Sequence, residues 1–271
     1  MEDSAGKSLR SSVIHRIGLR SMRGFGSFFH FATILGELII TFFTFFADQE
    51  PVVWRNWRRY CYSFGPCRLF RMCVFNFLIA FIVTSIAGMQ LEQLKIGSHF
   101  MDLVIASLLR TVAPLVVAMS VLITSAKNFT QDGLNRALRI SPEEEKNLLR
   151  YRLVPETVAI LFILPFMYVY ALFALLIGCL LASLWVMNMI PPEFVQQVQY
   201  KLQPVDYLSG IIKVALFALL IGIFKSHYYL LSFTSKRDIA NAVTRFVLNT
   251  VLWFVVIDFL VEYVVISYGI T

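Results

Sequence analysis

Five long apolar stretches alternate with more polar connections along the chain. A helix that crosses a membrane needs about 20 mostly apolar residues, and each stretch reaches or approaches that length. They are Met72–Gln90, Leu103–Ala126, Thr157–Ile190, Tyr207–Phe224 and Phe246–Tyr268. The pattern therefore predicts an all-α integral membrane protein with five transmembrane helices.

The third stretch is longer than one span requires, but a hairpin would leave no residues for a turn. We therefore predict a single long, tilted helix over Thr157–Ile190. Pro165 is placed to kink this helix, because proline removes one of the helical hydrogen bonds.

A sixth apolar run, Phe25–Ala47, lies between two blocks of basic residues. If it crossed the membrane, these blocks would lie on opposite faces, contrary to the usual distribution of Lys and Arg. We interpret it as an interfacial or re-entrant helix, and a sixth span is the alternative. Residues 1–69 are thus predicted to form a cytoplasmic N-terminal part, with an amphipathic helix and an elbow. Residues 70–271 are predicted to form the five-span domain.

Composition and charge agree with a membrane location. Of the 271 residues 58% are hydrophobic and only 15% are charged, which excludes an ordinary soluble domain and a disordered chain. The net charge of +7 comes from Lys and Arg that concentrate in alternate connections. This distribution favours the positive-inside rule over nucleic-acid binding. With five spans it predicts a cytoplasmic N-terminus and an external C-terminus.

The most polar stretch is the connection between the second and third spans, residues 127–152. It contains Gln131 and Asp132, then Ser141-Pro142 followed by Glu143, Glu144 and Glu145. Serine before proline and a run of acids is typical of a helix N-terminus, so a short cytoplasmic helix is expected here. The length of the connection favours a docking surface over a simple connector.

Motifs of catalytic or cofactor chemistry are not found in the sequence. There is no phosphate-binding G-x-x-x-x-G-K-[ST] loop and no G-x-S-x-G nucleophile elbow. The four histidines are far apart, and no two cysteines form a C-x-x-C pair. We therefore predict no cofactor, no metal site and no enzymatic activity in this chain.

Ionisable residues inside the apolar stretches are costly, and they mark function by default. Arg110 lies in the second stretch, Lys213 in the fourth, and Asp258 and Glu262 lie one turn apart in the fifth. One interpretation is a cavity in which the cations hold the phosphate of an amphiphile. The alternatives are that Lys213 extends to the membrane surface and that Asp258 pairs with Arg110 or Lys213 to fix helix packing.

Several short motifs, in order and spacing, resemble the MlaE/YrbE permeases, the membrane subunits of ABC transporters that move lipids with MCE proteins. The motifs are Gly88-Met89-Gln90, Leu108-Leu109-Arg110 with Pro114, Leu153-Val154-Pro155, Ile212-Lys213, Thr244-Arg245 and Ile257-Asp258-Phe259. The chain departs from the family pattern at Thr111 and Ala113, where the family has Glu and Gly. The glutamate motifs of the family's coupling segment have no counterpart in register here.

The resemblance implies a permease subunit that moves phospholipid between the inner membrane and the outer envelope of a bacterium. Two permease copies, identical or different, would pair around a lipid cavity, to which Arg110, Lys213, Gln90 and Asp258 would contribute. A cytoplasmic ABC ATPase would hydrolyse ATP and dock on residues 127–152, and an MCE-domain protein would lie on the outer face. The predicted coupling residues are Gln131, Asp132, Glu143, Glu144 and Glu145.

Two other functions remain as alternatives. The chain could be a membrane scaffold or assembly subunit of an envelope complex, in which Arg110 and Asp258 form structural ion pairs. An intramembrane enzyme is the third alternative, but the sequence offers no nucleophile or metal constellation for it.

Overall fold

The computed structural model describes residues 36, 50–93, 104–138, 149–186, 188–201, 204–229 and 235–267. The chain divides into two units, Met1–Ala47 and Asp48–Thr271, and the helices described below belong to the second. The predicted interfacial run Phe25–Ala47, apart from Gly36, lies outside the described residues, as do Glu143, Glu144 and Glu145.

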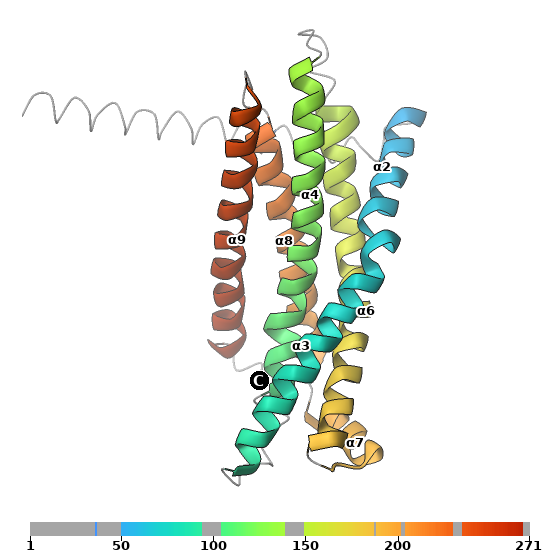
Figure 1. The fold of residues 1–271 in the computed structure, drawn as a ribbon, viewed down its shortest axis with the longest axis vertical. Helices are drawn as coiled ribbons and strands as arrows, with labels where there is room; N and C mark the ends of the chain where they lie inside the picture. The colour runs from blue at the N-terminus through green and yellow to red at the C-terminus, as the bar shows by residue number, and fades with distance from the viewer. Residues whose placement is uncertain are drawn as a thin grey trace, which may run out of the picture. The chain divides into compact units, whose positions relative to one another are not determined.

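The secondary structure of the described part of the second unit is entirely helical (Figure 1). Its elements are α2 (Pro51–Phe64), α3 (Pro66–Gln93), η3 (Leu108–Val112), α4 (Ala113–Leu138), η4 (Leu149–Leu153), α6 (Val154–Val186), α7 (Pro191–Lys201), α8 (Pro204–Tyr229) and α9 (Lys236–Ser267). Five helical segments are long and apolar enough to cross a membrane, and each overlaps one predicted span. The prediction of an all-α protein with five candidate spans is confirmed.

The longest of the described helices is α6, which runs without interruption through Pro165 and so confirms that one helix forms there. It ends at Val186, however, short of the predicted end at Ile190. It packs along α3, and the contact is close at Gly178. A Cβ atom at this position would lie 2.6 Å from the carbonyl oxygen of Phe77. Small residues allow helices to approach in this way in membranes, where lipid is as apolar as the side chains.

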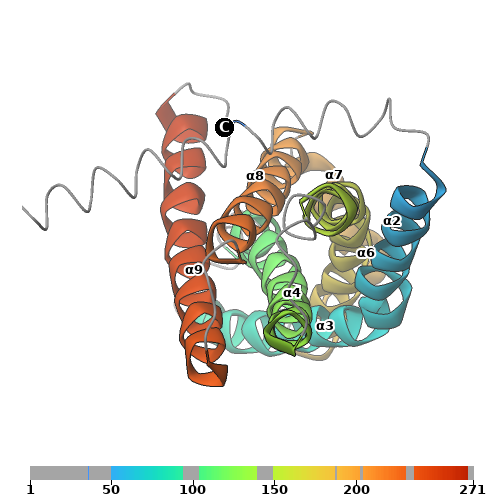
Figure 2. The ribbon, with the colours of Figure 1, turned by 90° about the horizontal axis from the view of Figure 1, so that it is seen from above.

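The helix α4 lies against α6, α8 and α9 and forms the centre of the packing. Figure 2, seen along the helices, shows α9 and α2 on opposite sides with α4, α6 and α8 between them. Aromatic rings join α9 to its neighbours. The ring centroids of Phe254 and of Phe217 in α8 are 4.5 Å apart, and the ring of Phe246 stacks on that of Phe129 in α4. Elsewhere α9 exposes large apolar side chains, among them Leu252, Phe259 and Tyr263.

The structure differs from the sequence predictions at several helix ends. The helix α4 continues to Leu138, beyond the predicted end at Ala126, and α8 continues past Phe224 to Tyr229. The short helix α7 was not predicted, because its sequence is too polar for a span. It follows Asn188, whose left-handed backbone (φ 50°) suits the turn after α6.

Candidate functional site

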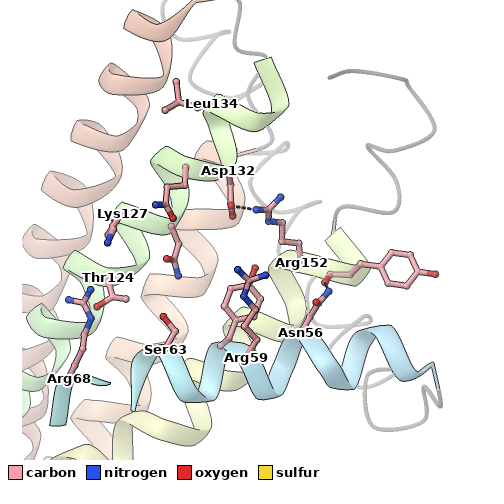
Figure 3. Close-up of a pocket in the computed structure, with 13 residues that line it drawn as sticks. Asn56, Arg59, Ser63, Arg68, Thr124, Lys127, Asp132, Leu134 and Arg152 are labelled. Carbon is pink, nitrogen blue, oxygen red and sulfur yellow. Dashed lines mark hydrogen bonds and ion pairs between the residues drawn. The ribbon is translucent and has the colours of Figure 1, made fainter. Parts of the chain in front are cut away.

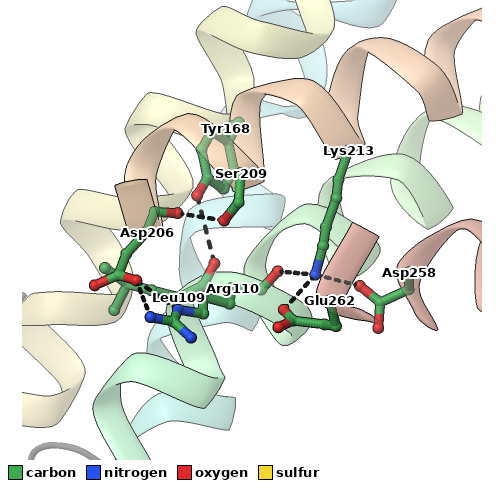
Figure 4. A network of polar contacts seen from close by, with 8 residues as sticks. All are labelled: Leu109, Arg110, Tyr168, Asp206, Ser209, Lys213, Asp258 and Glu262. Atoms are coloured by element: carbon green, nitrogen blue, oxygen red, sulfur yellow. Dashed lines mark hydrogen bonds and ion pairs between the residues drawn. The ribbon is translucent and has the colours of Figure 1, made fainter. Parts of the chain in front are cut away.

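Five charged side chains meet where η3, α8 and α9 come together (Figure 4). They are Arg110, Asp206, Lys213, Asp258 and Glu262, and we call them the charge network. Arg110 comes from η3, two of the others from α8 and two from α9, and none of these side chains is more than 22% exposed. Charges at such depth persist only when they are paired or line a polar cavity.

Lys213 is the most deeply buried member, with a side chain that is 0% exposed. Its Nζ atom lies 2.7 Å from Oδ1 of Asp258 and 2.6 Å from Oε1 of Glu262. It also donates a hydrogen bond of 2.9 Å to the backbone carbonyl of Arg110. This one ammonium group therefore ties α8 to both α9 and η3. The alternative that Lys213 extends to the membrane surface is wrong, and the predicted ion pair with Asp258 is confirmed.

Arg110 forms the second half of the network through an ion pair with Asp206, in the first turn of α8. The Asp206 side chain is only 2% exposed, whereas that of Arg110 is 19% exposed. Arg110 lies in the π-helical turn η3, and such turns occur frequently at functional sites. Behind it, the Tyr168 hydroxyl donates to the carbonyl of Leu109. Arg110 is therefore the network's cation with access to the surface.

The charges of the network do not sum to a positive site. Two cations, Arg110 and Lys213, face three carboxylates, so the formal charge is −1. The sequence analysis considered these cations as free phosphate ligands, but the structure shows both already paired. Gln90 is exposed near the end of α3, and none of the ion pairs that hold the described members of the network together includes it.

A polar cavity of about 880 Å³ lies among α2, the C-terminal half of α4 and η4 (Figure 3). We call it the basic pocket. Its lining residues are Asn56, Arg59, Tyr60, Ser63, Arg68, Thr124, Lys127, Asn128, Gln131, Asp132, Leu134, Tyr151 and Arg152. Gln131 and Asp132, two of the residues predicted to couple to an ATPase, therefore line this cavity.

The walls of the basic pocket are held together by polar contacts between distant parts of the chain. Asp132, which is 6% exposed, forms an ion pair with Arg152 of η4. The Asn56 amide donates a 2.8 Å hydrogen bond to the carbonyl of Tyr151. These contacts fix α2 and α4 to η4, so the position of Asp132 is set by a structural partner.

A further buried ion pair joins α6 to α8. Lys225 and Glu156 are 2% and 1% exposed, and their Nζ and Oε1 atoms are 2.5 Å apart. The Ser125 hydroxyl of α4 also contacts this oxygen, at 3.4 Å. Lys225 lies one residue beyond the predicted end of the fourth span at Phe224, where a cytoplasmic loop was expected, but the structure places it inside α8.

The family model described as "Permease MlaE" matches residues 144–264. Over these residues, fewer than half of the chain, the sequence is similar to the MlaE permease family. No curated protein matches the chain. The match implies the membrane subunit of an ABC transporter, which works with partner chains, rather than a catalytic domain.

The MlaE match covers the greater part of the charge network. Asp206, Lys213, Asp258 and Glu262 lie inside it, together with α6, α7, α8 and most of α9. Arg110 lies outside it, and so do Gln90, Gln131, Asp132 and Glu143. The family assignment therefore rests on the second half of the chain, and the network connects that half to Arg110.

Sequence reasoning missed two acidic residues that form buried ion pairs in this chain. Asp206 lies seven residues before Lys213, so both point to the same side of α8 after two turns. Glu156 lies in the first turn of α6, 69 residues before its partner Lys225 in α8. In each case an acid in the first turn of an apolar span was the available signal.

Among the described residues no group of His, Cys, Asp and Glu could hold a metal ion.

Proposed function

We propose that this chain is the permease subunit of an ABC transporter that moves phospholipid, with ATP hydrolysed by a partner chain. The observation that carries the proposal is the MlaE match over residues 144–264, in a chain with five candidate spans. A paired charge network inside those spans agrees with a polar surface that a headgroup could reach.

The assembly follows the family. Two permease copies, identical or different, enclose the lipid cavity, an ABC ATPase docks on residues 127–152, and an MCE-domain protein lies on the outer face. The chain lies in the inner membrane with its N-terminus in the cytoplasm and its C-terminus in the periplasm. The orientation is supported by the concentration of Lys and Arg near the basic pocket, as in cytoplasmic segments.

Within the charge network we assign different roles to the two cations. Arg110 contacts the headgroup phosphate, because its guanidinium is partly exposed and offers a planar fork to an oxyanion. Lys213 is a positioning residue, since it is fully buried and holds the carbonyl of Arg110 in place. A phosphate would take the place of the Asp206 carboxylate on Arg110, and Asp258 would act only through Lys213.

The test is ATP-dependent transfer of a fluorescent phospholipid by the complex purified with its ATPase and MCE partners. Arg110→Ala is expected to lower the transfer rate about tenfold, because one charge-assisted contact is lost. Arg110→Lys, which keeps the charge but loses the fork, should be intermediate. The control is Arg55→Ala, at an exposed position of α2 outside the basic pocket. Transfer by Arg110→Ala at the control's rate would remove Arg110 from lipid handling.

A scaffold or assembly subunit is the second candidate, and one observation favours it. Both cations of the network are paired with carboxylates, as expected of charges that only fix helix packing. A photoreactive crosslinker attached to Cys at Glu144 separates the two functions. A permease should capture the ATPase there, whereas a scaffold that has lost this partner should capture none.

A further inference from the structure

We propose that the basic pocket is a binding site for a phosphate group carried by an anionic lipid headgroup. It is separate from the charge network, where transport is proposed. The pocket lies between α2, η4 and the C-terminal half of α4, whereas the network lies at the opposite end of α4, beside η3. The proposal therefore does not depend on what the chain transports.

The first argument is the charge of the lining. Four cations, Arg59, Arg68, Lys127 and Arg152, face a single carboxylate, Asp132, which leaves a formal charge of +3. Asp132 is engaged by Arg152. Among the described residues no ion pair joins the other three cations to a carboxylate. Cations gathered around one cavity repel each other, and an oxyanion between them would relieve that repulsion.

The second argument is the kind and arrangement of the donors. Three of the cations are arginines, whose planar guanidinium groups bind phosphate through paired hydrogen bonds. Ser63 and Asn128 add neutral groups that can donate to oxygen. At about 880 Å³ the cavity is within the range of small-molecule sites, so it can hold a headgroup with several phosphate contacts.

The third argument is the level of the pocket along the helices. Arg68 stands in the first turn of α3, before its apolar stretch, and Lys127 follows the apolar stretch of α4. Both cations therefore lie where hydrocarbon gives way to water. Trp54 and Trp57 of α2 form an edge-to-face pair, and tryptophans of this kind favour the same membrane level. Headgroup phosphates occupy this level, and basic pockets between helices bind such headgroups.

The experiment measures binding by the full chain in a zwitterionic detergent. A fluorescent short-chain phosphatidylglycerol is titrated into wild type and into two double variants. Arg59→Gln with Arg68→Gln removes two charges from the pocket. Arg55→Gln with Arg58→Gln removes two charges from exposed positions of α2 outside it. We expect saturable binding that is at least about tenfold weaker in the pocket variant and unchanged in the control.

Inorganic phosphate and phosphatidylcholine separate the sources of the ligand. If the lipid binds and is displaced only weakly by phosphate or phosphatidylcholine, the ligand is the anionic lipid headgroup. If phosphate alone binds with the same loss in the pocket variant, the site takes free phosphate and the lipid assignment is overturned. If both double variants bind the lipid equally weakly, binding depends on the general surface charge of the protein, and the proposal is overturned.

The fold of the variants is checked by gel filtration and thermal unfolding. If the double pocket variant does not fold, Lys127→Gln is used, since this side chain is exposed on the surface of α4. Wild-type affinity in a folded Lys127→Gln protein would then count against the pocket.

Discussion

At the scale of single residues, Lys213 shows how one buried cation determines local stability. Replacing it by Met leaves Asp258 and Glu262 close together on α9 without a counter-charge. Removing one partner of a buried ion pair costs about 3–5 kcal/mol. We expect Lys213→Met to lower the thermal unfolding temperature in detergent well below that of Lys236→Met, a control at an exposed position.

The same residue provides a rescue that tests the cause. Combining Lys213→Met with Asp258→Asn and Glu262→Gln removes the uncompensated charges, and it should restore most of the lost stability. A triple variant no more stable than Lys213→Met would show that packing of the lysine stem, rather than charge, is what the site requires.

At the scale of helices, the contact of α6 with α3 depends on the missing side chain of Gly178. A Cβ there would lie 2.6 Å from a backbone oxygen and 3.0 Å from the Cβ of Ala80, so the helices would have to separate. Overpacking of this kind costs about 1–3 kcal/mol. Gly178→Ala should therefore lower the unfolding temperature, whereas Ile177→Ala, at a 53% exposed neighbour, should change it little. Equal unfolding temperatures would mean that α3 is free to shift.

The helices themselves could be predicted from the sequence, because a span is defined by its apolar length alone. Their ends could not, because they depend on partners that are distant in the chain. The helix α8 continues past the predicted end of its span and includes Lys225. The charge of this lysine can be buried there because it pairs with Glu156, 69 residues away in the sequence. The sequence could identify Arg110 and Lys213 as cations within apolar spans, but it could not show which carboxylates neutralise them. Asp206 is 96 residues from Arg110, and only the packing of α8 on η3 brings the two together.

At the scale of the whole molecule, the five spans predict that α7 and the basic pocket face opposite sides of the membrane. Exposed positions are available on both: Gln196 in α7 and Gln131 beside the pocket. Each is changed to Cys in a chain whose four native cysteines are replaced by Ser. Added to intact cells with a permeable outer membrane, a membrane-impermeant maleimide should label Gln196→Cys at once. Gln131→Cys should be labelled only after the inner membrane is permeabilised.

We expect this labelling pattern from the distribution of charge, because Lys and Arg gather around the pocket. Short loops rich in these residues are generally kept on the cytoplasmic side of the membrane. The cysteine-free chain is the control for background labelling, and labelling of both variants after permeabilisation shows that both thiols are reactive. Labelling of both in intact cells would place α7 and the pocket on one side and require an even number of spans between them. Protection of Gln196→Cys together with labelling of Gln131→Cys would invert the chain, and it would move the proposed ATPase surface and the lipid site to the outer face.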